Sequence, residues 1–181
     1  MNTAEYIMLK QEIIRRGYAS EVAWATGVGT PADANAFACE AIWVILNSGM
    51  REQVARIIWE RMRPTLMSGG NAKDAPFGHK LKCRAIDQIW QERVRLFNCF
   101  CECDESVRLD WIESLPHIGP ITKYHLARNL GMDVCKPDRH LVRIAAPGTP
   151  HDLCSQLSSA TGDRIGVVDC VIWRAANLGL V

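Results

Sequence analysis

The chain lacks any long uncharged apolar run, so its sequence contains no segment suited to crossing a bilayer as a helix. Near its start it carries Glu5 and Glu12, where a secretory signal peptide would have a basic start and an apolar stretch. We therefore expect an intracellular protein, in the cytoplasm or, for a bacterial or phage protein, at the nucleoid, without a membrane partner.

Paired cysteine motifs are also lacking, although the chain has 8 cysteines. Most of them stand in apolar helical contexts, which is typical of buried thiols. The closest group, Cys99, Cys101 and Cys103, has neither the C-x-x-C spacing of a zinc knuckle nor a nearby histidine. We therefore expect no metal and interpret this group as a helix end with incidental thiols.

A strong excess of either charge is lacking as well, because 21 basic and 20 acidic residues give a net charge of +1. This excludes a generic polyanion binder, whose affinity comes from neutralising many phosphates. From Leu115 onward, however, five of the seven basic residues lie between positions 123 and 143. Any nucleic-acid site is therefore expected to be local and to lie in this part of the chain.

Strict alternation of apolar and polar residues is absent, whereas helical spacing of apolar residues recurs along the chain. A broad apolar face formed by Ala38, Ala41, Ile42, Ile45 and Leu46 predicts a central helix. We expect Pro64 to end the helix that follows, and the glycine-rich stretch 68–78 to be either a mobile, DNA-facing loop or a surface connector. The sequence thus predicts an all-α fold with the following further apolar faces: Tyr6, Leu9, Ile13 and Ile14; Val54, Ile57, Ile58 and Met62; Ile86, Ile89, Trp90, Val94 and Phe97; and Ile165, Val168, Val171, Ile172 and Ala175.

The segment Leu115 to Thr122 has the pattern of two helices joined by a tight hairpin. Pro116 ends the first helix, Gly119 permits a tight turn with unobstructed backbone, and Pro120 suits the first turn of the next helix. Backbone N–H groups at such a positive helix terminus suit a phosphate without reading base sequence. The alternative is an ordinary corner between two helices that happens to contain glycine and proline.

Asp138 follows this hairpin at a defined distance. The second hairpin helix ends at Gly131, and the loop 132–137 then places Asp138 at the start of another helical pattern. An aspartate at that position often serves only as a helix N-cap, which is the alternative to a catalytic role.

These features resemble the helix-hairpin-helix (HhH-GPD) DNA glycosylase superfamily, with its endonuclease III and 8-oxoguanine DNA glycosylase relatives. Residues 138–143 fit the superfamily pattern D-x-H-x-x-[R/H], in which the aspartate follows the hairpin. Residues 78–86 look like the helix start G-x(n)-K-A-x-x-I, with Cys83 in the place of the alanine. Residues 45–50 look like the segment that fills the gap left by an extruded base.

The resemblance implies a two-lobed helical fold over residues 1–181, with the DNA and base site between the lobes. The central lobe would comprise about residues 38–135 with the hairpin 115–122, and the terminal lobe residues 1–37 plus 138–181. It also implies a monomeric repair enzyme that flips a damaged or mismatched base out of duplex DNA and hydrolyses its N-glycosidic bond.

The resemblance carries over to individual residues. The charge of Asp138 would stabilise the oxocarbenium-like transition state. Met50 or Asn47 would be the wedge, although burial in a helix packing site explains a methionine equally well. The DNA-binding residues would be His117, Ile118, Gly119, Ile121, Thr122, Lys123, Arg139 and His140. The base-pocket candidates are Trp24, Phe77, His79 and Trp173, all of which core packing also explains.

Two departures from the superfamily pattern refine this expectation. Ile121 stands where lyase-active members carry lysine, and Lys123 is rotated by about half a turn from that position. We therefore expect a mainly monofunctional glycosylase, with a lyase that uses Lys123 as the alternative. After Asp138 only Cys154 and Cys170 remain, so we expect no iron-sulfur cluster and no other cofactor, apart from a monovalent cation that the resemblance allows at the hairpin.

Two other classes of function remain open. One is a non-catalytic DNA-binding or scaffolding module that keeps the hairpin, which measurement of base release would separate from an enzyme. The other is a helical protein-interaction domain, which the low net charge supports. The sequence does not identify the lesion, so oxidised purine, alkylated base and mismatched base are all open.

Overall fold

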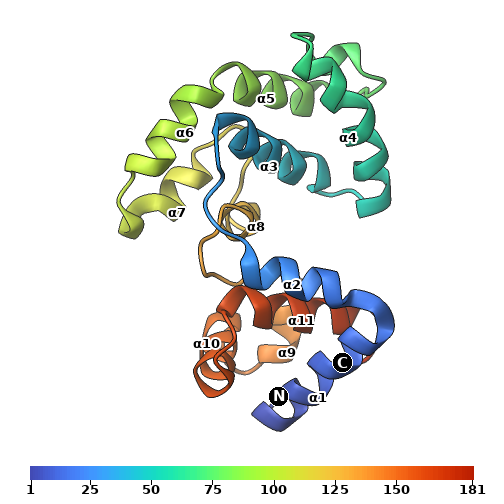
Figure 1. Cartoon of the computed structure of the whole chain (residues 1–181), viewed down its shortest axis with the longest axis vertical. Coiled ribbons are helices and arrows are strands. Elements are labelled where there is room, and N and C mark those ends of the chain that lie inside the picture. The colour runs from blue at the N-terminus through green and yellow to red at the C-terminus, as the bar shows by residue number, and fades with distance from the viewer. The chain divides into compact units, whose positions relative to one another are not determined.

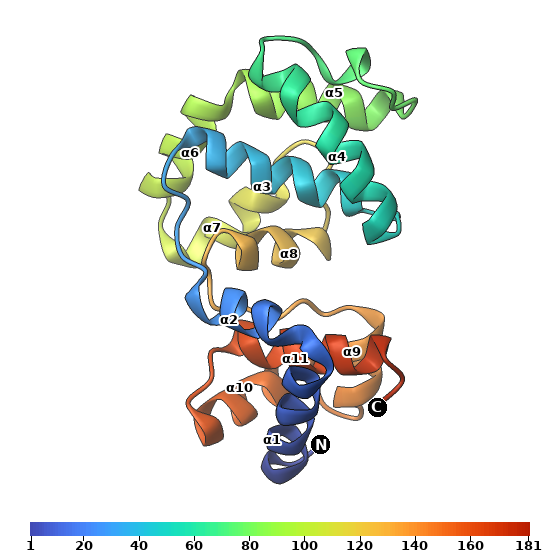
Figure 2. The ribbon, with the colours of Figure 1, turned by 45° about the vertical axis from the view of Figure 1, so that its right-hand side comes forward.

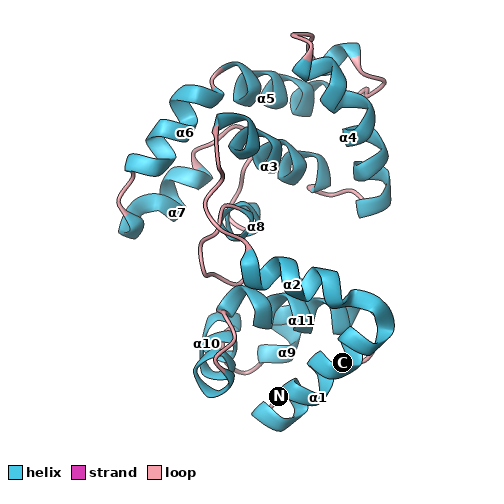
Figure 3. Ribbon diagram, in the orientation of Figure 1, coloured by secondary structure: helices cyan, strands magenta, loops and turns pink.

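The computed structural model describes residues 1–181 and contains helices and loops without a β-strand, which confirms the all-α prediction (Figure 3). No helix combines the length and apolar character that a bilayer crossing requires. The chain forms two compact units, which we call the terminal unit (Met1–Thr30 with Ala127–Val181) and the central unit (Pro31–Leu126) (Figure 1). The chain passes between the units at 30/31 and 126/127, whereas the expected lobe boundaries were 37/38 and about 135.

The terminal unit is built around its last helix, α11, which packs against α1, α2, α9 and α10. Val168, Val171 and Ile172 of α11 are completely buried. Of the predicted face on α1, Tyr6, Leu9 and Ile13 are buried, but Ile14 begins a π-helical turn and is 42% exposed. The elements of this unit are α1 (Thr3–Ile13), η1 (Ile14–Tyr18), α2 (Ala19–Gly27), α9 (Arg139–Ala145), α10 (Pro150–Thr161) and α11 (Ile165–Asn177).

The central unit is built around α3 (Ala34–Asn47), which packs against α4, α5 and α6 (Figure 2). Ala38, Ala41, Ile42, Ile45 and Leu46 of α3 are all 0% exposed, which confirms the prediction of a central apolar helix. The other elements are α4 (Glu52–Met67), η2 (Ala72–Asp74), α5 (Lys80–Gln91), α6 (Arg93–Glu102) and α7 (Glu105–Glu113), followed by α8 (Thr122–Asn129), whose last residues belong to the terminal unit.

Two details of the predicted helices were wrong. Helix α4 does not end at Pro64 but continues to Met67, because the proline stands in the last turns, where the Ser68 N–H still donates to the Pro64 carbonyl at 3.0 Å. Val94 is 60% exposed, because the chain turns at Glu92 between α5 and α6 and the apolar phase of one helix does not continue into the next. Val54 and Ile57 of α4 are also about half exposed.

The stretch 68–78 is partly pinned to α5. Its η2 turn buries Ala72, whose N–H donates to Asp87 Oδ1 at 2.6 Å. Ala75 is buried as well. The middle of this stretch is therefore packed against the unit, and it leads into Phe77 and His79 at the start of α5.

Candidate functional site

The hairpin between α7 and α8 takes its tight turn at His117 rather than at Gly119. His117 is the only non-glycine residue with positive φ (63°). A Cβ added to Gly119 would meet nothing closer than Thr122 Oγ1 at 3.9 Å. The expectation that Gly119 supplies the turn geometry was therefore wrong, because the left-handed backbone falls two residues earlier.

Gly119 instead caps the second helix of the hairpin. Its N–H donates to Thr122 Oγ1 at 2.7 Å, and its carbonyl accepts from the Lys123 N–H at 2.9 Å. The N–H groups of Ile121 and Thr122 bond to no atom of the chain, and Ile121 is 45% exposed. The outward N–H groups at this helix terminus are therefore those of Ile121 and Thr122, an arrangement suited to an anion.

The hairpin is anchored by apolar side chains and braced by an ion-pair group. Ile118 and Leu115 are buried in the central unit. Lys123 pairs with Glu113 at 2.6 Å and Asp110 at 3.3 Å, and these carboxylates, Glu113 foremost, raise the pKa of the ammonium. Lys123 thus joins α8 to α7 and is held protonated, which disfavours it as an amine nucleophile.

Three rings predicted for the site lie together in the central unit. The Phe77 and His79 rings stack with centroids 6.1 Å apart, and the His79 and His117 rings meet edge-on at 6.1 Å. His79 also caps α5, because its Nδ1 accepts from the Lys82 N–H at 3.3 Å. The structure therefore brings two base-pocket candidates next to the hairpin.

Lys82 is a member of this group that the sequence analysis missed. Its side chain is only 4% exposed, whereas the neighbouring Leu81 is 63% exposed. Lys82 Nζ donates to the carbonyls of Leu46 at 2.9 Å and Ser48 at 2.6 Å, so it closes the C-terminus of α3. The signal was its helical phase, because Lys82 stands four and seven residues before the buried Ile86 and Ile89.

The Lys82 ammonium also acts on the hairpin. The pKa of His117 is lowered, first by its partial burial and then by the charges of Lys82 and His79. Burial lowers the pKa of Lys82 itself. The Lys82 ammonium therefore disfavours protonation of His117 at the left-handed turn of the hairpin.

The wedge candidates stand in the turn that Lys82 closes. The Met50 N–H donates to the Asn47 carbonyl at 3.1 Å, with Gly49 at φ 67°. Gly49 is exposed at the tip, while Asn47 and Met50 are partly buried. A wedge role for either side chain stays a prediction.

Asp138 is the N-cap of α9 in the terminal unit. Its Oδ1 accepts from the His140 N–H at 2.9 Å and the Leu141 N–H at 3.1 Å. Its Oδ2 makes no hydrogen bond within the chain, and the residue is partly exposed. The capping interpretation is thus confirmed as a structural role, and one carboxylate oxygen remains for a ligand.

The neighbours of Asp138 in sequence are accessible. Arg139 is exposed and its Nε lies 3.4 Å from His140 Nε2, both in the first turn of α9. Lys136 is more enclosed, and burial lowers the pKa of its ammonium although Asp138 opposes this shift.

The two remaining base-pocket candidates belong to the terminal unit. Trp24 on α2 is 43% exposed, and Trp173 on α11 packs partly against the core. The guanidinium of Arg174 lies over the Trp173 ring at 4.9 Å. The four candidates are therefore divided between the two units, with Phe77 and His79 in the central one.

The residues present do not define a metal site. No group of three or more histidine, cysteine or acidic side chains has a metal-binding arrangement. A monovalent cation held by backbone carbonyls at the hairpin stays a prediction. Cys99, Cys101 and Cys103 lie at the end of α6 as free thiols.

No protein-family model, curated protein or solved structure matches this chain. The likeness to the helix-hairpin-helix glycosylases therefore depends on the motifs and stays a prediction.

Proposed function

We propose that the protein is a DNA glycosylase that releases a damaged or mismatched base from duplex DNA. The observation that carries the proposal is Asp138, which α9 holds by one carboxylate oxygen while the other is left without a partner. Asparagine caps a helix about as well as aspartate, so the charge on this free oxygen is what Asp138 would add for catalysis beyond capping.

The hairpin supplies DNA binding in this proposal. The N–H groups of Ile121 and Thr122 would donate to a phosphate at the positive terminus of α8, and exposed His117 lies beside them on the hairpin turn. Contacts of this kind position DNA without reading its sequence.

The chemistry belongs to Asp138. As the N-glycosidic bond breaks, positive charge develops on the sugar, and the free Oδ2 of Asp138 would stabilise it. The same oxygen can orient a water molecule at the anomeric carbon. Arg139 and His140, in the first turn of α9, would contact the DNA backbone near the sugar.

The reaction is proposed to be hydrolytic. Lys123 is paired with two carboxylates that raise its pKa, so it offers no neutral amine for a Schiff base. Borohydride added during turnover should trap little protein on DNA, and strand cleavage should require alkali. Strong trapping that disappears in Lys123→Gln would establish the lyase alternative instead.

The deciding experiment compares Asp138→Asn with the wild type on duplexes that each carry one lesion or mismatch. Asparagine keeps the capping oxygen but not the charge, so base release should fall by about 100-fold or more while binding of the duplex persists. Asp104→Asn is the matched control, because Asp104 caps α7 by accepting from the Ser106 N–H at 2.8 Å. Near wild-type release by Asp138→Asn would refute the catalytic assignment.

The capping role of Asp138 favours one second candidate, a hairpin module that binds DNA without chemistry. It predicts that the wild type binds duplex DNA but releases no base from any member of the panel. Absence of both binding and release would instead favour a protein-interaction domain.

A further inference from the structure

The segment 131–138 delivers Asp138 to α9 without regular secondary structure of its own. The segment starts at Gly131, whose backbone packs closely against that of Gly29. A Cβ added to Gly131, which has a φ of 89°, would lie 2.4 Å from the Gly29 carbonyl carbon. Arg164 holds these two backbone stretches together by donating to the carbonyls of Val28 at 2.6 Å and Gly131 at 2.7 Å. The end of the segment, next to Asp138, needs a separate attachment.

That attachment comes from α11. Asp133 Oδ1 accepts from the Gly166 N–H at 3.0 Å at the first turn of this helix. One turn later, Asp169 Oδ2 accepts from the Lys136 N–H at 2.7 Å. The Lys136 carbonyl in turn accepts from the Asp138 N–H at 2.7 Å. Asp169 is therefore one backbone hydrogen bond removed from Asp138.

Asp169 is an unusual residue for its place. It is 1% exposed within an otherwise apolar stretch of α11, and burial raises the pKa of its carboxyl. Its partner is Arg128, whose Nη1 lies 3.1 Å from Asp169 Oδ2. Gly166 leaves room for this arginine, because a Cβ there would lie 3.4 Å from Arg128 Cγ.

Such a buried pair is a poor source of stability, since desolvation of the two charges offsets much of their attraction. An apolar pair of similar volume would pack α11 as well. What an apolar pair cannot provide is an acceptor for the Lys136 N–H. The geometry thus ties the acceptor oxygen of Asp169 to the path of the backbone before Asp138.

We infer that Asp169 is a positioning residue, which holds Lys136 by its backbone and thereby fixes the carboxylate of Asp138 for base release. The inference depends on the proposed function. A displacement of about 1 Å at a reacting group can cost about 100-fold in rate, so a modest shift of this loop should be measurable.

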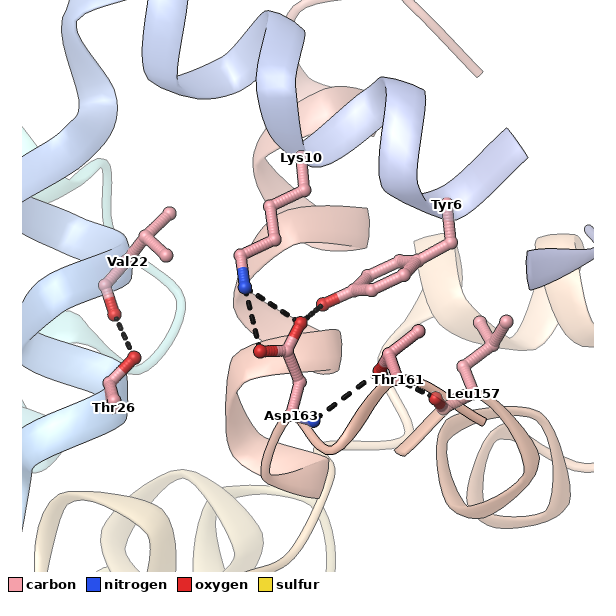
Figure 4. A network of polar contacts seen from close by, with 7 residues as sticks. All are labelled: Tyr6, Lys10, Val22, Thr26, Leu157, Thr161 and Asp163. Carbon is pink, nitrogen blue, oxygen red and sulfur yellow. Dashed lines mark hydrogen bonds and ion pairs between the residues drawn. The ribbon is translucent and has the colours of Figure 1, made fainter. Parts of the chain in front are cut away.

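The same unit offers a matched control in Asp163, at the start of α11 (Figure 4). Asp163 Oδ2 accepts from the Tyr6 hydroxyl at 2.7 Å, and Oδ1 accepts from Lys10 Nζ at 2.6 Å. This network ties α1 to the loop that precedes α11 and includes no residue of the segment 131–138. Asp163→Asn therefore weakens the unit without loosening Asp138.

The experiment measures single-turnover base release, duplex affinity and amide exchange at Lys136 in the wild type, in the double variant Arg128→Met/Asp169→Leu and in Asp163→Asn, each corrected for its folded fraction. The double variant replaces the buried pair by apolar side chains and removes the acceptor for the Lys136 N–H, so we expect release to fall about 10-fold or more, affinity to stay within about twofold, and the Lys136 amide to exchange faster. Asp163→Asn should keep both the release rate and the exchange of this amide.

Unchanged release in the folded double variant, or an equal loss in Asp163→Asn, would overturn the inference while leaving the proposed function intact. No release by the wild type would overturn the proposed function itself. If the double variant does not fold, Asp169→Glu keeps the charge but displaces Lys136 by one methylene. A release rate in that variant equal to the wild type would also overturn the inference.

Discussion

The two units place their functional residues by different means, although an ion-pair group also braces the hairpin of the central unit. In the central unit a predominantly apolar helix, α3, organises the fold, and one buried charge, Lys82, closes its end. In the terminal unit charged side chains cross between segments, as Asp169 does with Arg128 and Asp163 with Lys10. Apolar packing tolerates exchange of one side chain shape for another, whereas a directed hydrogen bond specifies one backbone path.

The largest expected effect tests the role of α3. Ile42→Ala removes a side chain that is 0% exposed and should lower the free energy of unfolding by about 2–5 kcal/mol. Ile57→Ala on α4, where the side chain is 50% exposed, should cost less than about 1 kcal/mol. Urea denaturation measures both, and equal costs would remove the distinction between α3 and the helices around it.

The next effect tests the close backbone contact between Gly131 and Gly29 in the terminal unit. Gly131→Ala forces a Cβ to within 2.4 Å of Gly29 at a φ of 89° and should cost about 2–4 kcal/mol. Gly119→Ala meets open space and should cost less than about 1 kcal/mol. Thermal unfolding of the two variants decides, and a larger loss at Gly119 would contradict the assignment of the tight turn to His117.

A smaller effect concerns the hairpin as an anion site. Gly119→Asp adds a residue type that favours the N-cap but places negative charge beside the free N–H groups of α8. Affinity for duplex DNA should fall about 10-fold, equivalent to about 1.4 kcal/mol, for any base sequence. Gly119→Ser, a neutral cap, should bind within about twofold of the wild type. Equal binding by folded Gly119→Asp would count against docking of the hairpin on DNA.

His117→Gly should stabilise the central unit. Glycine takes φ 63° without the steric cost that histidine has there, so the free energy of unfolding should rise by about 1 kcal/mol. The rise should be smaller if the contact with His79 contributes much. A decrease in the denaturation midpoint would show that the His117 ring contributes more than its backbone costs.

The smallest effect is a pKa. Partial burial, then the charges of Lys82 and His79, hold the pKa of His117 below its ordinary value of 6.5, so this group contributes stability that is present above pH 6.5 and lost as the pH falls through the lowered pKa. Lys82→Met removes one of the charges responsible and should raise the pKa of His117, as followed by NMR titration. Lys10→Met, in the terminal unit, should leave that titration unchanged.

Helix type and the central place of α3 followed from the sequence, because apolar spacing at a helical period reports burial directly. The hairpin and the cap at Asp138 were also predictable from local chemistry, since proline, glycine and aspartate restrict the backbone within a few residues. Two features were not predictable: the change of the apolar face at the Glu92 turn between α5 and α6, and the continuation of α4 past Pro64. Both depend on which residues the neighbouring helices bury.

The candidate site shows the same division. The sequence by itself determined which residues can cap or carry charge, as with Asp138 at the start of α9. Only the tertiary structure decided that Lys82 turns inward to close α3, that Lys123 is already paired, and that Asp169 reaches the backbone of Lys136. These contacts join residues far apart in the chain, and their energies exist only once the helices pack and exclude water from the charges.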